Sequence, residues 1–350
     1  MIHAIVLMLA MQVPAQDPAE HQTAGIAALK AAQNDQAIAE FKKEIELDPA
    51  SAPGYFGLGI AFMQSKDFAA AITPLKKALE LDPNLTAVHK PLSYALLTAG
   101  YAAESIPHFQ KSGDKAGLGI AELQTGDLLN AVQNLQGALA ERPNDPDLIY
   151  YLARATGLLS KELTDNLLAE YPNSARANLA SAENYAALRQ EQDAEANFQA
   201  ALKQRPDLPG AHLALGQLYA TESKWKEAEA EYREEAKLAP GNAEAAYRLG
   251  MALLQEGNAA QAATELERSN RLLPDMPEAL FGLGKAESLV GNSAAAEKAW
   301  KRVIELEKTG TLAAQAHFGL AGLYRKEGKA TDAAREMQAF QDAKGPQKAQ

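Results

Sequence analysis

The chain has 350 residues, of which 47% are apolar and only 6% aromatic, and its sequence contains no cysteine. The lack of cysteine excludes disulfides, thiolate nucleophiles and cysteine-based zinc sites. The formal net charge of −11 would repel the phosphates of nucleic acids, so we expect no nucleic-acid partner.

The N-terminal segment MIHAIVLMLAMQVPAQ differs from the rest of the chain. Ala4 to Met11 is an unbroken apolar run, and Val13-Pro14-Ala15 resembles a small-residue cleavage site. We therefore expect residues 1–15 to be a signal peptide cut after Ala15, which predicts a periplasmic or secreted protein. The segment holds no Lys or Arg, so an uncut leader with membrane contact, or a cytoplasmic protein, stays open as an alternative. The run is too short to span a bilayer.

A small residue recurs along the rest of the chain at a nearly constant interval. Most successive occurrences are 34 residues apart, and three gaps of 26, 29 and 37 residues depart from this period. A fixed period in this range predicts a stacked repeat array, which behaves as one elongated domain. The recurring small residues are Gly25, Gly59, Ser93, Gly119, Ala153, Ala182, Gly216, Gly250, Gly284 and Ala321.

Residues 52–85 show the repeating unit most clearly. Tyr55, Leu58 and Phe62 fall on one face of a predicted helix, and a polar break follows at residues 64–67. A second apolar stripe at helical spacing ends at Pro83, which cannot continue a helix. Each unit is therefore predicted to be a helix–turn–helix, with its small residue where the two helices cross.

The unit resembles the tetratricopeptide repeat. About ten such units cover residues 18–343, and the resemblance implies an all-α, right-handed superhelical solenoid of antiparallel helix pairs. It also implies a non-catalytic scaffold whose partners are proteins or peptides. Counted from Ala52, repeat positions 4, 7, 8, 11, 20, 24, 27 and 32 are Tyr55, Leu58, Gly59, Phe62, Ala71, Leu75, Ala78 and Pro83.

The third, fifth and ninth units are irregular. The third has a shortened second helix after Phe109, the fifth lacks five residues across an expected turn at Gly157–Lys161, and the ninth gains three around Gly310. We expect altered curvature near residues 105–115 and 155–165. Either drift in turn length or a bend between two binding segments, 18–111 and 175–343, explains the irregularity. Residues 344–350 form a polar tail, and the polar face of the last helix is expected to cap the array towards solvent.

No arrangement of polar residues in the sequence indicates catalysis or metal binding. The histidines His21, His89, His212 and His317 fall at repeat position 4, which is a packing position. Three Gly-Leu-Gly segments lack the strand and the third glycine that a nucleotide-binding loop requires. The carboxylates Glu227, Glu229, Glu231, Glu234 and Glu235 are expected on solvated helix exteriors. We therefore expect no enzyme activity, no cofactor, no bound metal and no small-molecule substrate.

Repeat positions 5, 9 and 12 of the first helices are expected to line a concave groove. Several apolar and aromatic side chains occupy this stripe, which favours apolar or helical ligands. Asn at position 9, which relatives that clamp a C-terminal carboxylate use, is absent from every unit. The alternative function is that of a membrane-associated envelope assembly factor with an uncut N-terminal segment. The predicted groove residues are Phe56, Ile60, Tyr94, Ile120, Tyr150, Tyr247 and Phe281.

Overall fold

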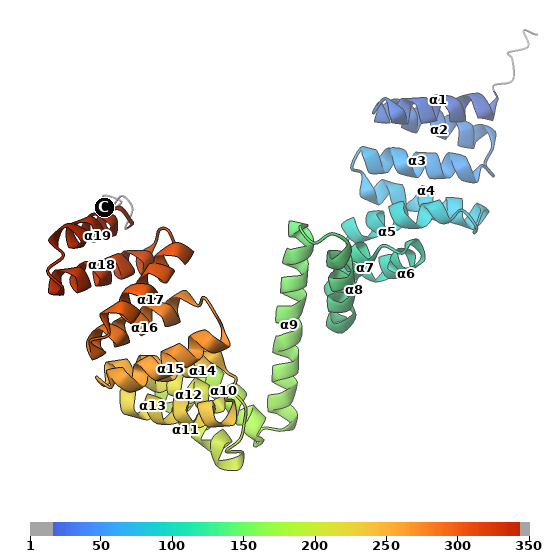
Figure 1. Cartoon of the computed structure of the whole chain (residues 1–350). Coiled ribbons are helices and arrows are strands. Elements are labelled where there is room, and N and C mark those ends of the chain that lie inside the picture. The colour runs from blue at the N-terminus through green and yellow to red at the C-terminus, as the bar shows by residue number, and fades with distance from the viewer. Residues whose placement is uncertain (1–16, 344–350) are drawn as a thin grey trace, which may run out of the picture. The chain divides into compact units, whose positions relative to one another are not determined.

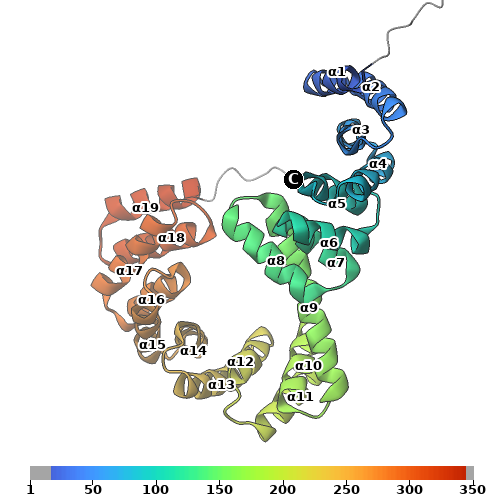
Figure 2. The same ribbon diagram turned by 90° about the vertical axis from the view of Figure 1, so that its right-hand side faces the viewer.

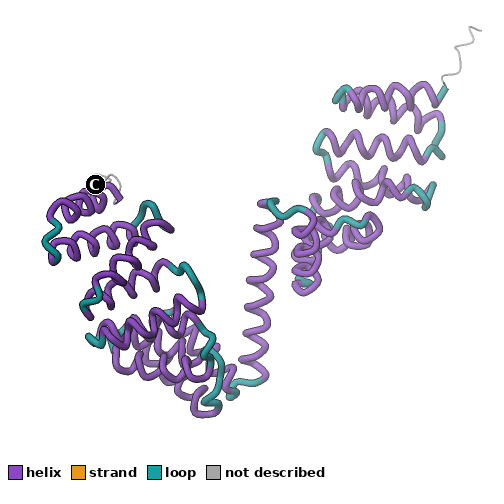
Figure 3. Tube along the Cα trace, in the orientation of Figure 1, coloured by secondary structure: helices purple, strands orange, loops and turns teal. Residues whose placement is uncertain are grey.

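The computed structural model describes residues 17–343, and this part of the chain contains α-helices, one short 3-10 helix and no strand (Figures 1 and 3). The predicted signal peptide and the polar tail lie outside the described residues. The all-α helix-pair architecture that the repeat predicts is confirmed. The chain divides into two compact units, with the boundary between Leu163 and Thr164.

The first unit stacks successive antiparallel helix pairs (Figure 1). Each pair forms tight contacts within itself and with the next pair along the chain. Its helices are α1 (Pro18–Lys30), α2 (Asn34–Leu47), α3 (Ala52–Gln64), α4 (Phe68–Leu81), the 3-10 helix η1 (Thr86–Val88), α5 (His89–Thr98), α6 (Ala102–Ser112), α7 (Lys115–Thr125), α8 (Leu128–Glu141) and the first part of α9 (Pro146–Glu170).

The second unit continues the same plan after the end of α9 (Figure 2). Two apolar clusters lie between its first and second helices. Its helix pairs are α10 (Ala175–Ala187) with α11 (Glu191–Gln204), α12 (Ala211–Thr221) with α13 (Trp225–Leu238), α14 (Ala243–Gln255) with α15 (Ala259–Leu272), α16 (Pro277–Val290) with α17 (Ser293–Leu306), and α18 (Thr311–Lys326) with α19 (Ala330–Ala343).

The small residue at position 8 makes the close helix crossing that the sequence predicts. A Cβ atom added to Gly59 would lie 2.5 Å from the Leu75 side chain, and one added to Gly216 would lie 2.6 Å from the Tyr232 ring. In both repeats the covering residue lies on the second helix, at repeat position 24. The first helix therefore needs a small residue there, because the second helix places a large side chain against its backbone.

The Gly-Leu-Gly segments are explained by packing on both sides of a first helix. In α3, Gly59 accommodates Leu75 from its own repeat, and Gly57 accommodates Phe41 from the preceding repeat. Each glycine thus makes room for a different second helix, and neither belongs to a nucleotide-binding loop.

The turn within each helix pair has a left-handed residue at position 15. Glycine occupies this position in five pairs, for example Gly257 with φ +82°. Ala32, Lys66, Arg189 and Ser223 occupy it in the other four, with φ between 55° and 62°. The sequence does not reveal this turn conformation, because so many units place a side chain where glycine is favoured.

The irregular third and ninth units take the form that the sequence predicts. Helix α6 has 11 residues, whereas second helices such as α4 and α13 have 14, and it ends at the left-handed residue Gly113. In the ninth unit, the extra residues form the loop before α18, where Gly310 has φ +117°. The expected changes in curvature stay predictions.

The fifth unit differs from its prediction, because no turn interrupts residues 157–161. One helix, α9, runs without a break from Pro146 to Glu170 (Figure 3). The expected turn is therefore wrong. Gly157 is followed by Leu-Leu-Ser-Lys-Glu-Leu, a run of mostly good helix formers, and a single internal glycine costs only about 1 kcal/mol. A deletion at the turn thus converts two helices into one.

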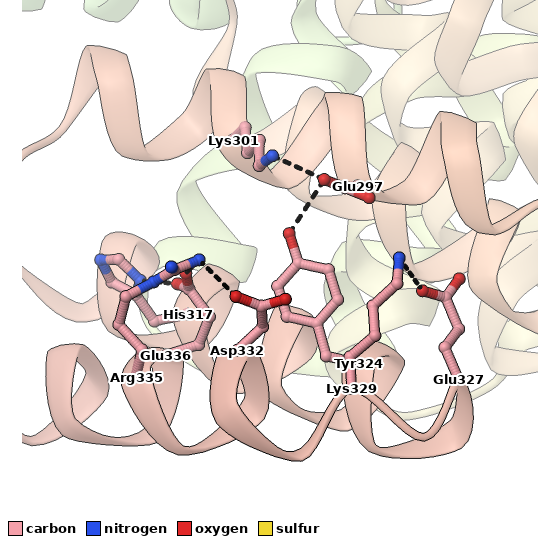
Figure 4. Close-up of polar contacts among 9 residues, drawn as sticks. All are labelled: Glu297, Lys301, His317, Tyr324, Glu327, Lys329, Asp332, Arg335 and Glu336. Atoms are coloured by element: carbon pink, nitrogen blue, oxygen red, sulfur yellow. Dashed lines mark hydrogen bonds and ion pairs between the residues drawn. The ribbon is translucent and has the colours of Figure 1, made fainter.

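The last repeat ends in a network of ion pairs (Figure 4). Glu336 of α19 faces inward and accepts a hydrogen bond from His317 of α18 at 2.7 Å, so this residue is not part of the solvent-facing cap that the sequence predicts. Tyr324 donates a hydrogen bond to Glu297 of α17 at 2.9 Å, and Lys301 pairs with the same carboxylate.

Within residues 17–343, no helix has both the length and the apolarity needed to cross a bilayer.

Candidate protein-binding groove

Two adjoining cavities lie along the first helices of the second unit. One is bounded by α10, α11 and α12, the other by α12, α13 and α14, and each has a volume of about 490 Å³. Gln217 and Thr221 of α12 line both cavities, so the two form one continuous surface, here called the inner groove. Its α12–α14 cavity is lined by Gln217, Ala220, Thr221, Trp225, Tyr232, Tyr247, Arg248, Met251, Ala252 and Gln255.

Aromatic side chains form the α12–α14 cavity of the inner groove. Tyr232 is buried at its base against Gly216, and burial raises the pKa of its phenol to about 12. Tyr247 is half-buried against the core of the unit, and the Arg248 guanidinium lies 5.5 Å from the centre of its ring. Arg248 also donates a hydrogen bond to Glu244 at 2.6 Å, which holds the guanidinium at the cavity wall. This cavity can enclose one bulky apolar side chain.

The α10–α12 cavity is more polar at its edge. Phe198 and Leu218 supply buried apolar surface, while Glu183, Arg189 and Glu191 lie around the opening. A mostly apolar concave surface with a few polar groups is the usual form of a ligand site. The groove can therefore hold a chain segment through apolar anchors, with the charged side chains contacting polar groups of the ligand.

The predicted groove residues in the first unit do not line either cavity. Phe56 and Ile120 are half-buried and pack against apolar clusters, and Ile60 is also half-buried. Tyr150 is 60% exposed on α9. These positions keep a binding role as a prediction.

Tyr94 has an intramolecular role that the sequence does not reveal. Its hydroxyl donates a hydrogen bond to Asp114 at 2.9 Å, and its ring packs edge-on against Phe109. Burial, together with this bond, raises the pKa of Tyr94 to about 12. Although burial acts to raise the pKa of Asp114, hydrogen bonds from the Gly117 N–H, Lys90 and Tyr94 hold it below its usual value. Tyr94 thus fastens α5 to the start of α7, across the shortened third unit.

Of the predicted groove residues in the second unit, Tyr247 lines the inner groove and Phe281 packs half-buried against the next apolar cluster. Sequence reasoning does not single out Gln217 and Met251, although both occupy position 9 of the predicted stripe. Trp225 and Arg248 lie outside that stripe, and the spacing of the repeats does not predict that they line a groove.

The histidines at position 4 form bonds within their own repeats. His21 contacts Glu40 and His212 contacts Glu231, both at 2.6 Å, so position 4 meets position 23 of the same unit. The hydrogen bond from His21 lowers the pKa of Glu40. In the third unit, the Nδ1 atoms of His89 and His108 lie 2.9 Å apart. Within residues 17–343, no group of three or more His, Asp or Glu side chains is placed to hold a metal ion.

The expectation that α13 exposes all its carboxylates is wrong for Glu235, Glu231 and Glu229. Glu235 is buried, with 3% of its surface exposed, and its Oε2 atom lacks a hydrogen-bond partner. Glu231 is half-buried beside His212, and Glu229 is half-buried in its ion pair with Arg233. Glu235 occupies repeat position 27, where Ala78 and Ala201 stand in other units, so α13 carries an acid at a packing position.

A third cavity, of about 800 Å³, lies across α15, α16 and α17, on the side formed by second helices. Ion pairs occupy much of its lining. Arg302 binds both oxygens of Asp275 at 2.8 and 2.6 Å, and Lys301 pairs with Glu297. Because these charges neutralise one another, this cavity is a weaker candidate for a binding site than the inner groove.

Comparison with protein families gives a match to the model described as "Tetratricopeptide repeat". The matched regions are residues 23–85, 179–243, 213–277, 247–288 and 290–349, which together cover more than half of the chain. The chain belongs to the tetratricopeptide repeat family. The matches leave out residues 86–178, which hold the short third tetratricopeptide unit and the unbroken helix α9.

Several solved structures are similar to parts of this chain. YrrB, described as a TPR protein with an unusual peptide-binding site, is 19% identical with a TM-score of 0.48, covering 53% of this chain and 93% of its own. MamA is 19% identical with a TM-score of 0.46, covering 48% and 91%. Cut9 with Hcn1 is 14% identical with a TM-score of 0.44, covering 94% and 88%. No curated protein matches the chain by sequence.

Proposed function

We propose that this protein is a non-catalytic scaffold that binds a peptide or a helical segment of another protein in the inner groove. The observation that supports this most directly is the continuity of the two cavities through Gln217 and Thr221. A stacked repeat array offers an extended surface of this kind, and aromatic anchors are frequent hot spots in protein interfaces.

The chemistry of the groove favours a ligand with a bulky apolar side chain. Trp225, Tyr247 and Met251 surround the space that this side chain would fill. The amide of Gln217, at the junction of the cavities, can exchange hydrogen bonds with the ligand backbone. The segment would lie across the first helices, with its polar groups near Glu183 or Arg189.

The test is peptide binding by the full chain and by variants of the groove. Peptides selected from a random library on the wild-type chain are labelled, and their affinities are measured by fluorescence anisotropy. We expect Met251→Glu and Gln217→Arg to weaken binding by about tenfold or more. Gln133→Arg, at an exposed glutamine of α8, is the matched control. Equal affinities for all four proteins would contradict the proposal.

The predicted stripe of the first unit is a second part of the proposal. Phe56, Tyr94 and Tyr150 are replaced together by alanine, and the same peptides are measured. We expect weaker binding for peptides that contact this unit, with an unchanged far-UV helical signal as the check on folding. If no peptide is affected, the stripe has a packing role alone.

We also propose that the chain is exported, on the strength of its N-terminal pattern. The apolar run Ala4–Met11 and the small residues that end at Ala15 support cleavage before Gln16. Mass spectrometry of the mature protein should find Gln16 at its N-terminus. A mature protein that begins at Met1 in a membrane fraction would support the alternative, an envelope assembly factor with a retained N-terminal segment.

A further inference from the structure

In helix α9, no second helix covers the small residue at repeat position 8, where the two helices of other repeats cross. At position 8, the small residues of the other units, among them Gly59, Gly216 and Gly284, are buried beneath a second helix. Ala153 of α9 is the single exposed member of this set in residues 17–343. The fifth unit thus has the first-helix pattern, but no second helix of its own lies over it.

The missing second helix is present as the C-terminal half of the same helix. Residues 146–157 follow the first-helix pattern, and Leu148 and Ala155 pack into the apolar cluster that includes Leu135. The second half ends at Tyr171-Pro172, the same exit that closes other units at Pro83 or Pro240. Counting back from Pro172 places Ser160 at the small position 20 and Leu163 at position 23. Both halves of a repeat therefore lie on one continuous helix.

The contact that would join these halves is made in other repeats. There, positions 4 and 23 touch: His21 meets Glu40, and His317 meets Glu336. In α9 the same positions are Ile149 and Leu163, which are 50% and 59% exposed. They lie about 21 Å apart along a helix with a rise of 1.5 Å per residue, so they cannot meet within one chain.

We propose that two copies of this protein pair antiparallel through α9. The first half of one α9 lies against the second half of the other, so Ile149 of each copy contacts Leu163 of the second copy. The two-fold axis makes this contact twice and covers Ala153 in both chains. We assign the uncovered face of α9 to a second copy of this protein. The second half of α9 has the pattern of the missing second helix, in the register that its first half requires.

The mass of the full chain in solution tests the pairing. Light scattering across a dilution series should give a dimer for the wild type. Ile149→Glu and Leu163→Glu should each shift the dissociation constant by about tenfold or more, because they place charge in an apolar contact. Leu289→Glu, on α16 at an equally exposed leucine, is the matched control and should remain dimeric. A wild-type monomer at every concentration would overturn the proposal.

Cysteine cross-linking distinguishes pairing between copies from a hairpin within one copy. The chain has no native cysteine, so Ala153→Cys with Thr164→Cys introduces the only thiols, at positions 8 and 24. We expect oxidation of the double variant to give a covalent dimer with no free thiol left. Each single variant should keep its thiol free in the α9-paired dimer, because it has no cysteine opposite. An intrachain disulfide in a monomer would show that residues 157–161 form a turn. That result, or no disulfide at all, would overturn the proposal.

Discussion

At the scale of single residues, the repeat spacing predicts which positions must stay small but not which buried positions carry charge. Gly59 and Gly216 were predictable because the helix crossing recurs with the period of the repeat. The burial of Glu235 was not, since an acid among Glu227, Glu229 and Glu234 matches the pattern of a solvated helix face. What buries Glu235 is the packing of α13 against its neighbours, which a charge pattern does not encode.

The crossing glycine gives the first stability prediction. Gly216→Val would force its side chain into the buried ring of Tyr232, and we expect the free energy of unfolding to fall by about 1–3 kcal/mol. Gly322→Val in α18 is the control, because no atom lies within 4 Å of a Cβ added there. Thermal unfolding followed by circular dichroism should show a lower midpoint for the first variant than for the second. Equal midpoints would mean that the crossing at Gly216 is not tight.

The buried acid of α13 gives a prediction of opposite sign. Glu235→Met keeps the volume of the side chain and removes a carboxylate whose Oε2 has no partner. We expect a gain in stability on the order of 1 kcal/mol, since a buried polar atom without a hydrogen-bond partner costs free energy that an apolar group of similar size does not. Glu234→Met, next to it but exposed and paired with Lys237, should have little effect. A loss of stability in Glu235→Met would show that the carboxylate has a partner or a role.

At the scale of elements, the helix pairs follow from the sequence, and α9 does not. Each regular pair has a polar break and a proline exit, which mark its two helices. In the fifth unit Gly157 suggests a turn, but Leu158 and Leu159 continue the helical pattern, and the deletion leaves too few residues to reverse the chain. Whether such a segment bends or continues depends on a few kcal/mol, which spacing alone does not decide.

The histidine pair of the third unit predicts a pH dependence for the α5–α6 contact. Burial lowers the pKa of both His89 and His108, and the charge of Lys111 lowers both values further. At His108, Lys76 also lowers the pKa, whereas Glu104 raises it. Because the folded-state pKa values lie below the unfolded value of about 6.5, the folded state binds fewer protons. The contribution of this pair is therefore complete above pH 6.5 and is lost as the pH falls below it.

The variant His108→Glu provides the comparison for this pH effect. It restores at position 23 the glutamate that partners a histidine in other units, such as Glu40 with His21. We expect the wild-type melting temperature to fall more than that of the variant between pH 7.5 and pH 5.5. Equal shifts in the two proteins would mean that the histidine pair does not contribute to the pH dependence of stability.

At the scale of the whole molecule, the fold class follows from the repeat and the proposal of a protein partner rests on it, but the place of binding does not follow. The predicted stripe spans both units, and of the residues predicted as groove residues, Tyr247 lines the inner groove. Gln217 and Met251 share the stripe, yet their residue types do not mark them as anchors. A cavity forms where neighbouring side chains leave space, and this depends on packing between repeats, which a one-dimensional pattern leaves out.

Hydrogen–deuterium exchange of the full chain, with and without a selected peptide, shows where the peptide binds. If the peptide binds in the inner groove, it slows exchange in α12 and α14, residues 211–221 and 243–255, and Met251→Glu abolishes this protection. Helix α15, which does not line the inner groove, should exchange at an unchanged rate. Protection confined to α15, or to regions outside the second unit, would contradict binding in the inner groove.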